Sequence, residues 1–326
     1  MTTKKDIESM FTGVVGQTKA KQVLKFYIEG HSATNTIPHM MLVAPKGCGK
    51  TLMARSLALN LIQKGETKCK SRVLINCASV KNLEQFFDQI VMPKLIDTDV
   101  TVFFDECHMI PSDVQNALLT VLNPNKNMSN TFSFGEFDWE VDFRRISFIF
   151  ATTESQKVID PLMDRCRRID LEDYTHEDLQ RMLTINVDDK ISFDNKSLSE
   201  IATTLRGNGR AAQKMSDDIM TYCAKNRKRK FTLSDWNRLK ESLDISPLGL
   251  NRTELKVLRA LSEQPYTKLT SLAAKLGMSK SSIMNDFEMY LQKLGLFEID
   301  PLGRQLTAKG RNYLKLLDEG IVINKK

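Results

Sequence analysis

Residues 41–52 read MLVAPKGCGKTL, and this stretch decides the fold of the chain. The apolar run from Met40 to Val43 predicts a buried strand. The next residues, APKGCG, cannot continue a strand and predict a tight loop. Lys50 and Thr51 then open a segment with helical periodicity. A strand, a glycine-containing loop, Lys-Thr and a helix form the phosphate-binding P-loop arrangement.

The residue types in this loop suit a bound polyphosphate. Gly47 and Gly49 let backbone N–H groups turn inward, where the phosphate also meets the positive end of a helix dipole. The Lys50 ammonium can reach the β- and γ-phosphates, and the Thr51 hydroxyl can ligate Mg²⁺. The pattern usually begins with Gly, and Ala44 is the smallest available change. ATP and Mg²⁺ are therefore expected, although an ordinary strand-to-helix loop is the alternative. The expected nucleotide contacts are Ala44, Pro45, Lys46, Gly47, Cys48, Gly49, Lys50, Thr51 and Leu52.

The composition is that of a soluble globular protein of about two or three domains, with 326 residues, 41% hydrophobic and 27% charged. No apolar run approaches the roughly 20 residues that a membrane span needs, and the polar N-terminus does not resemble a secretion signal. The six cysteines are scattered without a C-x-x-C pair, which favours free thiols in a reducing cytoplasm. A net charge of +7 is compatible with a nucleic-acid partner.

Apolar runs alternate with amphipathic segments through the first half of the chain. Strands are expected at 40–43, 73–76, 100–104 and 146–150, and helices at 19–29, 83–90 and 114–122. This alternation predicts an α/β fold with a parallel sheet and a ligand at the carboxyl ends of its strands. After Ile169 the strand signals fade and helices follow. The expected domains are a P-loop ATPase core (1–172), a helical lid (173–246) and a C-terminal DNA-binding domain (247–326).

Two carboxylates end the third expected strand, in VTVFFDE. Asp105 can hold Mg²⁺ through water, and Glu106 can polarise the attacking water. Without a P-loop, these acids would equally well be surface groups at a strand end. Thr153 ends the next expected strand, so its hydroxyl can sense the γ-phosphate or orient that water. The sequence predicts catalytic roles for Glu106 and Thr153 and, with Thr51, a metal-binding role for Asp105.

Two arginines are expected to act on the nucleotide. Arg165 lies in DRCRR near the end of the expected core, where an arginine delivered to a neighbour's γ-phosphate can neutralise the charge of the transition state. Arg210 follows Gly207-Asn208-Gly209 at the start of a lid helix and can close onto bound nucleotide. The alternatives are a solvated basic turn and an ordinary arginine in a first helical turn.

The C-terminal part has the pattern of a helix-turn-helix followed by a wing. In LTSLAAKLGMSKSSIMNDF, Ala273, Gly277 and Ile283 have the spacing of that motif. LGLFEIDPLGRQLTAKG then predicts a two-stranded wing with an arginine near its tip. Residues 248–326 hold 13 Lys and Arg against 8 Asp and Glu, which favours phosphate contact. A protein-binding winged helix is the alternative. The expected DNA contacts are Lys280, Ser281, Ser282, Asn285 and Arg304.

The segment 131–143, TFSFGEFDWEVDF, alternates apolar residues around Gly135 and predicts a β-hairpin. Some of its five aromatic residues must pack inward, while others can form an exposed patch for a partner. The sequence does not divide them, so a purely structural hairpin stays open. His108, after the acidic pair, is expected to pack or to support that pair.

With these residues in hand, the chain resembles the RuvB family, AAA+ motors that drive Holliday-junction branch migration. The resemblance runs from GVVGQ at 13–17 through APKGCGKT, FFDECH, FATT, PLMDRCR and GNGRAAQK to LGRQLTAKG. It implies an AAA+ core, a helical lid and a C-terminal winged helix. The implied roles are Walker B for Asp105 and Glu106, sensor 1 for Thr153, arginine finger for Arg165, sensor 2 for Arg210, and adenine contact for Val14 and Val15.

The resemblance also implies an assembly. The expected form is a homo-hexameric ring around branched double-stranded DNA, acting in recombination, repair or replication, with a junction-binding protein docked on the hairpin at 131–143. Ala44 and the aromatic hairpin depart from the family pattern, as would suit a phage or mobile-element relative.

Three other functions compete with the motor. A clamp-loader-like ATPase is the main alternative, because Asp164-Arg165-Cys166 resembles the Ser-Arg-Cys box of clamp loaders. A superfamily 2 helicase would need a second strand-rich domain, which residues 171–326 do not offer. The non-enzymatic alternative is a DNA-bound regulator that binds ATP without turnover.

Overall fold

The computed structural model describes residues 4–319, which form two compact units. The first unit runs to Met182 and also includes Gly207–Ala211. The second consists of Leu183–Arg206 and the chain from Ala212 onward. Each unit has a hydrophobic core of its own. The expected division into three domains, at 172 and 246, stays a prediction.

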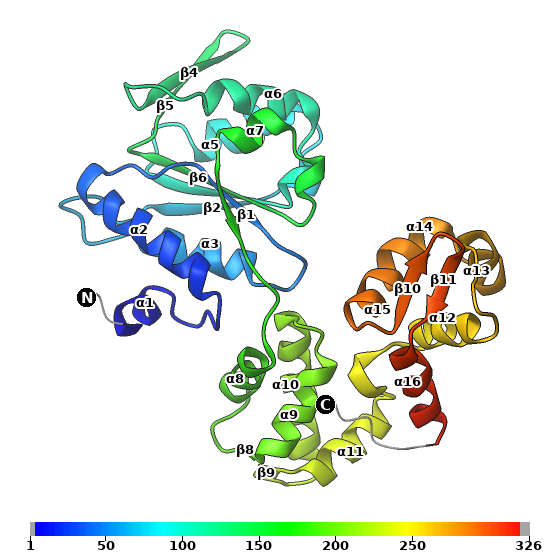
Figure 1. Cartoon of the computed structure of the whole chain (residues 1–326). Coiled ribbons are helices and arrows are strands. Elements are labelled where there is room, and N and C mark those ends of the chain that lie inside the picture. Colours follow the sequence, from blue (N-terminus) through cyan, green and yellow to red (C-terminus); the bar gives the residue numbers. More distant parts are fainter. Residues whose placement is uncertain (1–3, 320–326) are drawn as a thin grey trace. The chain divides into compact units, whose positions relative to one another are not determined.

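The first unit is built on a five-stranded parallel sheet with the strand order β2-β3-β6-β1-β7 (Figure 1). The strands are β1 (Met40–Val43), β2 (Ser71–Asn76), β3 (Val100–Asp105), β6 (Ile146–Thr152) and β7 (Arg167–Asp170). The four strands expected from apolar runs are all present, and the predicted α/β class is confirmed. The fifth strand, β7, was not predicted.

Helices cover both faces of this sheet (Figure 1). One face packs against α2 (Thr18–Thr34) and α3 (Lys50–Leu59), which bury Leu24, Ile28, Met53 and Leu57. The opposite face packs against α6 (Ser112–Val121) and the continuous segment of α4 (Leu83–Phe86), η2 (Phe87–Val91) and α5 (Met92–Lys94). The remaining short elements are α1 (Lys4–Met10), η1 (Cys77–Ser79), η3 (Cys107–Met109), η4 (Ser155–Lys157) and α7 (Asp160–Asp164). Because both faces are covered, the central strands β3 and β6 are almost continuously apolar.

A buried polar cluster lies near the amino ends of the strands. Lys70, 4% exposed, donates from Nζ to Oγ of Ser147 at 3.1 Å, and Ser147 is 1% exposed. Burial lowers the pKa of Lys70 to about 8, although Asp99 and Asp142 partly oppose the shift. Burial also lowers the pKa of the neighbouring His31 to about 4, and the charge of Lys70 adds to that effect. A cationic lysine at this position therefore destabilises the folded unit at neutral pH.

The double substitution of Lys70→Met with Ser147→Ala should raise the thermal midpoint of the first unit by about 2–4 °C at pH 7. The folded-state pKa, about 8, lies below the usual 10.5, so the unfavourable contribution is complete below pH 8 and fades as the pH rises to 10.5. Thermal unfolding across this range should show a steeper rise of stability with pH in the parent chain than in the variant, because only the parent has the contribution of Lys70. Ser147→Ala alone should destabilise, because it leaves the buried ammonium without its acceptor. An unchanged pH profile would contradict the assignment.

The predicted hairpin is present as β4 (Ser129–Phe134) and β5 (Phe137–Asp142). Trp139 and Phe143 are buried in the core, and the ring of Phe134 lies 4.9 Å from that of Phe87. Phe137 is 43% exposed. Most of the aromatic residues therefore fasten the hairpin to the core, and the exposed apolar surface at its tip is small.

The second unit contains the lid helices and the C-terminal domain. The lid elements are α8 (His176–Asn186), which begins in the first unit, β8 (Ser192–Phe193), α9 (Asn195–Thr204), α10 (Gly209–Lys225), β9 (Lys230–Phe231) and α11 (Leu233–Ser242). The C-terminal elements are η5 (Pro247–Gly249), α12 (Arg252–Ser262), α13 (Leu269–Leu276), α14 (Lys280–Ser282), η6 (Ile283–Glu288), α15 (Met289–Lys293), β10 (Phe297–Asp300), β11 (Gly303–Leu306) and α16 (Ala308–Asp318). The predicted winged helix is confirmed.

Its turn follows the sequence signals closely. Helix α13 ends at Leu276 and is capped by Gly277, which has a φ of +65°. The Ser279 side chain then accepts a hydrogen bond from the N–H of Ser282 at 3.0 Å. The second helix of the motif runs without a break through α14, η6 and α15. Strands β10 and β11 pair antiparallel to form the wing.

Arg206 joins the lid helices to the winged helix within the second unit. Its guanidinium donates to both carboxylate oxygens of Glu254, a residue that is 0% exposed, and to the carbonyl oxygen of Gly249. Its guanidinium carbon also lies 4.2 Å from the centre of the Tyr290 ring. Together these contacts form the Arg206 joint.

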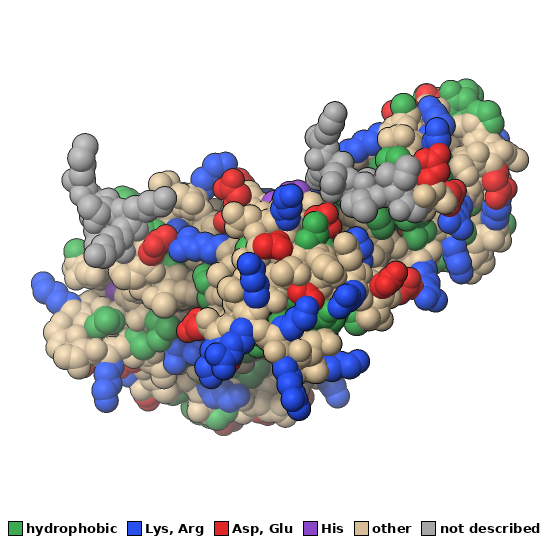
Figure 2. Space-filling view, turned by 90° about the horizontal axis from the view of Figure 1, so that it is seen from below, with side chains coloured by type: hydrophobic (Ala, Val, Ile, Leu, Met, Phe, Trp, Pro, Cys, Tyr) green, Lys and Arg blue, Asp and Glu red, His purple; other side chains and the backbone are tan. Residues whose placement is uncertain are grey.

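The surface carries charges of both signs. Figure 2 shows Lys and Arg side chains spread over the face in view, with Asp and Glu side chains between them. Within residues 4–319, no helix is long and apolar enough to cross a membrane. None of the six cysteines, which all lie within the described residues, forms a disulfide.

Candidate active site

The P-loop leaves the carboxyl end of β1 and turns into α3. Gly47 and Gly49 both have a φ of +87°, in the left-handed region that other residues rarely occupy. Cys48 is buried, whereas Thr51 and Leu52 are exposed. The loop therefore has the backbone form that lets successive N–H groups face one centre. Val14 and Val15 are each 6% exposed, and their contact with adenine stays a prediction.

Lys50 reaches back over this loop. Its Nζ donates to the carbonyl oxygen of Ala44 at 2.9 Å and lies 3.4 Å from that of Pro45. Burial lowers the pKa of Lys50, and the carboxylates of Glu106 and Asp105 oppose the shift. Arg210 adds to the lowering, so its charge also lies within electrostatic reach. Charged groups expected from two other parts of the sequence therefore lie within electrostatic reach of Lys50.

These residues fit a nucleotide and its metal ion. The glycine loop and the ammonium suit phosphate oxygens, and the carboxylate and hydroxyl oxygens of Asp105 and Thr51 are the hard ligands that Mg²⁺ prefers. Strands β3, β6 and β1 are neighbours in the sheet, so their carboxyl ends bring these groups to one edge. The roles of the individual residues stay predictions.

Glu106 and Thr153 are in direct contact. The Thr153 hydroxyl donates to Oε2 of Glu106 at 2.9 Å, and the Thr153 N–H lies 3.3 Å from the same oxygen. Glu106 has a φ of +54°, in the left-handed region that a residue with a side chain occupies only when its surroundings hold it there. The predicted water-activating carboxylate and the predicted sensor therefore form one hydrogen-bonded pair.

His108 lies against this pair, in line with one of the two roles expected from the sequence. Its side chain is 6% exposed, its Nδ1 lies 3.0 Å from Oγ1 of Thr152, and its Nε2 lies 3.4 Å from Oε1 of Glu154. Nδ1 is also 3.5 Å from Oε2 of Glu106. Glu154 in turn pairs with Lys157 at 2.7 Å. The histidine thus holds the polar groups at the ends of β3 and β6 together.

Arg165 does not lie with these groups. It precedes β7, whose first residue, Arg167, pairs with Met40 at the start of β1, whereas the P-loop follows the far end of β1. Its guanidinium donates to the carbonyl oxygen of Pro161 at 2.8 Å and to Oδ1 of Asn123 at 3.3 Å. It lines a cavity of about 550 Å³. The length of the sheet separates Arg165 from the P-loop of its own chain.

The expected DNA contacts divide into two groups. Lys280, Ser281 and Asn285 are exposed on the second helix of the winged helix, and Ser282 is half-buried there. Arg304 was expected to contact DNA from near the wing tip, and this contact stays a prediction. Its side chain is only 14% exposed and pairs with buried Glu288, with 2.8 Å between Nε and Oε1. Arg304 therefore fastens the wing to the second helix, because Glu288 needs a counter-charge.

Two family models match the chain. Residues 40–174 match the ATPase family associated with various cellular activities, AAA. Residues 247–315 match the RuvB C-terminal winged helix domain. The RuvB subunit of the Holliday junction branch migration complex from Mycoplasmopsis pulmonis is 26% identical over 312 residues, which cover 94% of this chain and 96% of that protein.

The chain belongs to the RuvB family. A second RuvB, from Mycoplasma pneumoniae, is 25% identical over 282 residues and covers 85% of this chain and 87% of its own length. Among solved structures, the Thermotoga maritima RuvB branch migration motor is similar with a TM-score of 0.73 at 21% identity, covering 92% of this chain and 95% of that one. A point mutant of the same protein gives a TM-score of 0.75.

Membership in the RuvB family confirms the resemblance seen in the motifs. The AAA match makes the first unit an ATPase domain. The RuvB-type winged helix gives the clamp-loader alternative no support. After residue 171, the described part of the chain has mostly helices, and its sheets have two strands each. It therefore contains no second strand-rich domain of the kind that a superfamily 2 helicase requires.

Proposed function

We propose that this chain is an ATP-driven motor that migrates branched duplex DNA. The observation that carries the proposal is the joining of an AAA ATPase core to a RuvB-type winged helix in one chain. The relatives that match over most of its length are named as subunits of the Holliday junction branch migration complex. ATP with Mg²⁺ is the proposed fuel, and the cytoplasm is the proposed location.

The position of Arg165 supports an assembly of several copies. This arginine lies beside the amino end of β1, and the P-loop lies beyond the carboxyl end. Neighbouring copies in a ring would place the Arg165 of one subunit against the nucleotide of the next. A homo-hexamer around duplex DNA is the proposed form.

Within each site, this chain's residues divide the work. The P-loop N–H groups and Lys50 bind the phosphates, and Asp105 with Thr51 would hold Mg²⁺, which neutralises phosphate charge when bound. Glu106 orients and polarises the attacking water, and the Thr153 hydroxyl fixes the position of that carboxylate. Arg165 of the neighbouring subunit neutralises the charge that develops on the transferred phosphoryl group.

Migration of a synthetic four-way junction tests the proposal directly. The purified chain, with ATP and Mg²⁺, should convert a junction with homologous arms into two duplexes, in the presence of a junction-binding protein if the ring does not load unaided. The same reaction without ATP is the control. Failure to migrate the junction, combined with stimulation of clamp loading, would support the clamp-loader alternative instead.

Lys280→Ala should weaken binding to duplex DNA. It should also reduce the slope of log affinity against log salt concentration by about one, the amount expected for the loss of one phosphate contact. Lys280 is exposed at the start of the second helix, where a cation can meet the DNA backbone. Fluorescence anisotropy with labelled duplex at several salt concentrations measures both quantities.

Lys275→Ala is the matched control, because Lys275 lies on the preceding helix and pairs with Glu263. Its variant should bind DNA almost as the parent does. Arg304→Ala is a poor probe of DNA contact, because loss of the pair with Glu288 should destabilise the wing. Unchanged affinity in Lys280→Ala would favour a protein-binding winged helix.

The hairpin of β4 and β5 is proposed to dock a junction-binding protein. Phe137 supplies the exposed apolar group at the tip, and Thr131 and Ser133 are exposed on the same strand pair. Because the remaining aromatic residues pack inward, such an interface would be small and would depend on Phe137.

A further inference from the structure

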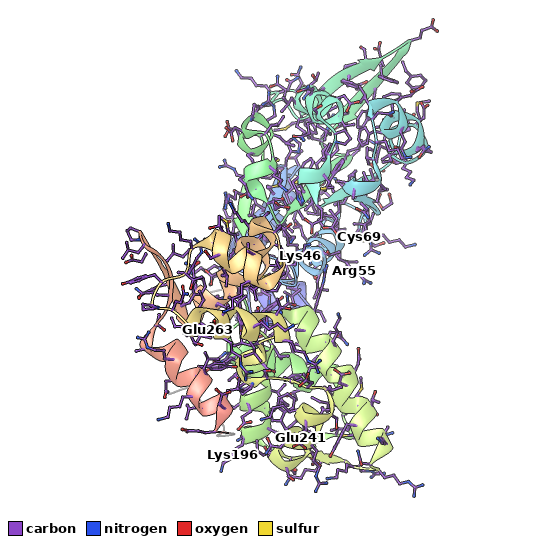
Figure 3. The ribbon with its side chains drawn as sticks, turned by 90° about the vertical axis from the view of Figure 1, so that its right-hand side faces the viewer. Lys46, Arg55, Cys69, Lys196, Glu241 and Glu263 are labelled. Carbon is purple, nitrogen blue, oxygen red and sulfur yellow. The ribbon has the colours of Figure 1, made fainter. Side chains whose placement is uncertain are left out.

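Three consecutive carbonyl groups of the P-loop accept hydrogen bonds from outside the loop. The Asn208 Nδ2 donates to the carbonyl oxygen of Lys46 at 2.9 Å (Lys46 is labelled in Figure 3). The backbone N–H of Gly209 donates to that of Gly47 at 2.9 Å, and the Tyr174 hydroxyl donates to that of Cys48 at 3.0 Å. All these residues belong to the first unit.

These bonds hold the phosphate-binding form of the loop. In a trans peptide, the C=O of one residue and the N–H of the next point in opposite directions. Carbonyls that are held outward at Lys46, Gly47 and Cys48 therefore turn the following three N–H groups inward, toward the place of the phosphates. Without such partners, outward carbonyls would be free to rotate and the cradle would be only one of several loop forms.

Asn208 and Tyr174 lie so close to the loop that they restrict which residues can occupy positions 47 and 49. A Cβ at Gly47 would lie 2.2 Å from Oδ1 of Asn208, and a Cβ at Gly49 would lie 2.5 Å from the Tyr174 hydroxyl. The two glycines are therefore needed for the approach of these side chains as well as for their positive φ. Tyr174 is 5% exposed, and burial raises its pKa to about 12, so its hydroxyl keeps the proton that it donates.

Asn208 also organises the segment that carries Arg210. Its Oδ1 accepts hydrogen bonds from the N–H groups of Arg210 at 2.9 Å and Ala211 at 3.1 Å, which caps the first turn of α10. One amide thus holds the P-loop with its nitrogen and the start of α10 with its oxygen. Neither end can shift without breaking one of these bonds.

We propose that Asn208 and Tyr174 are positioning residues that hold the P-loop in its nucleotide-binding form. Asn208 also fixes the position of Arg210 relative to the loop. The proposal rests on the ATPase activity and is independent of DNA migration. The hydrogen bonds that carry the proposal run from both side chains to backbone carbonyls of the loop.

The test compares Asn208→Ser, Asn208→Ala and Tyr174→Phe in the full chain. The serine hydroxyl can still cap α10 but is too short to reach the Lys46 carbonyl, and phenylalanine keeps the ring of Tyr174 while losing the hydroxyl. The dissociation constant of a fluorescent ADP analogue with Mg²⁺ is measured by equilibrium titration. Loss of one loop bond should weaken binding about five-fold in Asn208→Ser and in Tyr174→Phe.

Further readouts separate positioning from folding. The KM for ATP should rise with little change of kcat in Tyr174→Phe, and the double variant of Asn208→Ser with Tyr174→Phe should lose less affinity than the product of the single effects, because both act on one loop. Asp194→Ala is the control, since Asp194 caps α9 in the same manner. It should lower the thermal midpoint and leave the dissociation constant unchanged.

Two outcomes would overturn the proposal. One is an unchanged dissociation constant in both Asn208→Ser and Tyr174→Phe. The other is weaker binding in Asn208→Ala alone, which would assign the effect to the helix cap. A parent chain that binds the analogue normally but does not migrate junctions would contradict the motor and leave this inference intact.

Discussion

Replacement of Glu106 by Gln is expected to lower ATP turnover at least about 100-fold while nucleotide binding is retained. The Gln side chain has nearly the same shape and can still meet Thr153, whose hydroxyl lies 2.9 Å from Oε2 in the parent. It cannot polarise the attacking water as a carboxylate does. Release of inorganic phosphate at saturating ATP measures turnover, and titration with a fluorescent ADP analogue measures binding.

Glu154→Gln is the matched control for this substitution. Its carboxylate also faces His108, but it pairs with Lys157 and has no predicted catalytic role. This variant should keep most of the turnover. If Glu106→Gln hydrolyses ATP as fast as an active parent, the catalytic role of Glu106 is wrong. If neither the variant nor the parent hydrolyses ATP, the motor proposal falls and the ATP-binding regulator without turnover takes its place.

Arg165→Ala is expected to reduce hydrolysis by about a thousand-fold or more without loss of nucleotide affinity. The reason is geometric: Arg165 lies beside the amino end of β1, so it cannot complete the P-loop site of its own chain. Removal of its guanidinium should therefore leave the binding of nucleotide unaltered and remove a charge from the neighbouring site.

Mixing of variants tests this sharing between subunits. Lys50→Ala subunits lose their own site but still carry Arg165, so they should restore part of the activity of Arg165→Ala subunits. Arg168→Ala is the control, because Arg168 pairs with Asp170 within β7 and should be dispensable. A loss of nucleotide affinity in Arg165→Ala as large as the loss of turnover would contradict the arginine-finger role, as would a mixture no more active than its parts.

The strands of the sheet were predicted well where burial on both faces requires an unbroken run of apolar residues. Strands β3 and β6 lie between two layers of helices, so they appear as unbroken apolar runs. Strand β7 was missed because it is an edge strand with the sequence RRID, in which Ile169 is the one apolar and buried residue. Its hydrogen bonds are supplied by β1, and no local periodicity records them.

Long-range partners account for what the sequence did not predict at the site. Arg304 was correctly placed in the wing, but its partner Glu288 lies on the preceding helix, and the local pattern does not say which way the guanidinium turns. Asn208 and Lys46 are 162 positions apart. The motifs therefore identified the residues expected to meet the nucleotide, while the side chains that hold the loop required the fold.

The Arg206 joint limits how this chain can exchange parts with its relatives. Glu254 is fully buried, and its counter-charge comes from Arg206, on the far side of α10 and α11 in the sequence. A recombination event that replaced only the C-terminal module would have to bring a compatible acid, ring and carbonyl to meet this arginine, or leave its partly buried guanidinium without a carboxylate. Inheritance should therefore favour transfer of lid and DNA-binding module as a single cassette, with crossovers placed before Arg206.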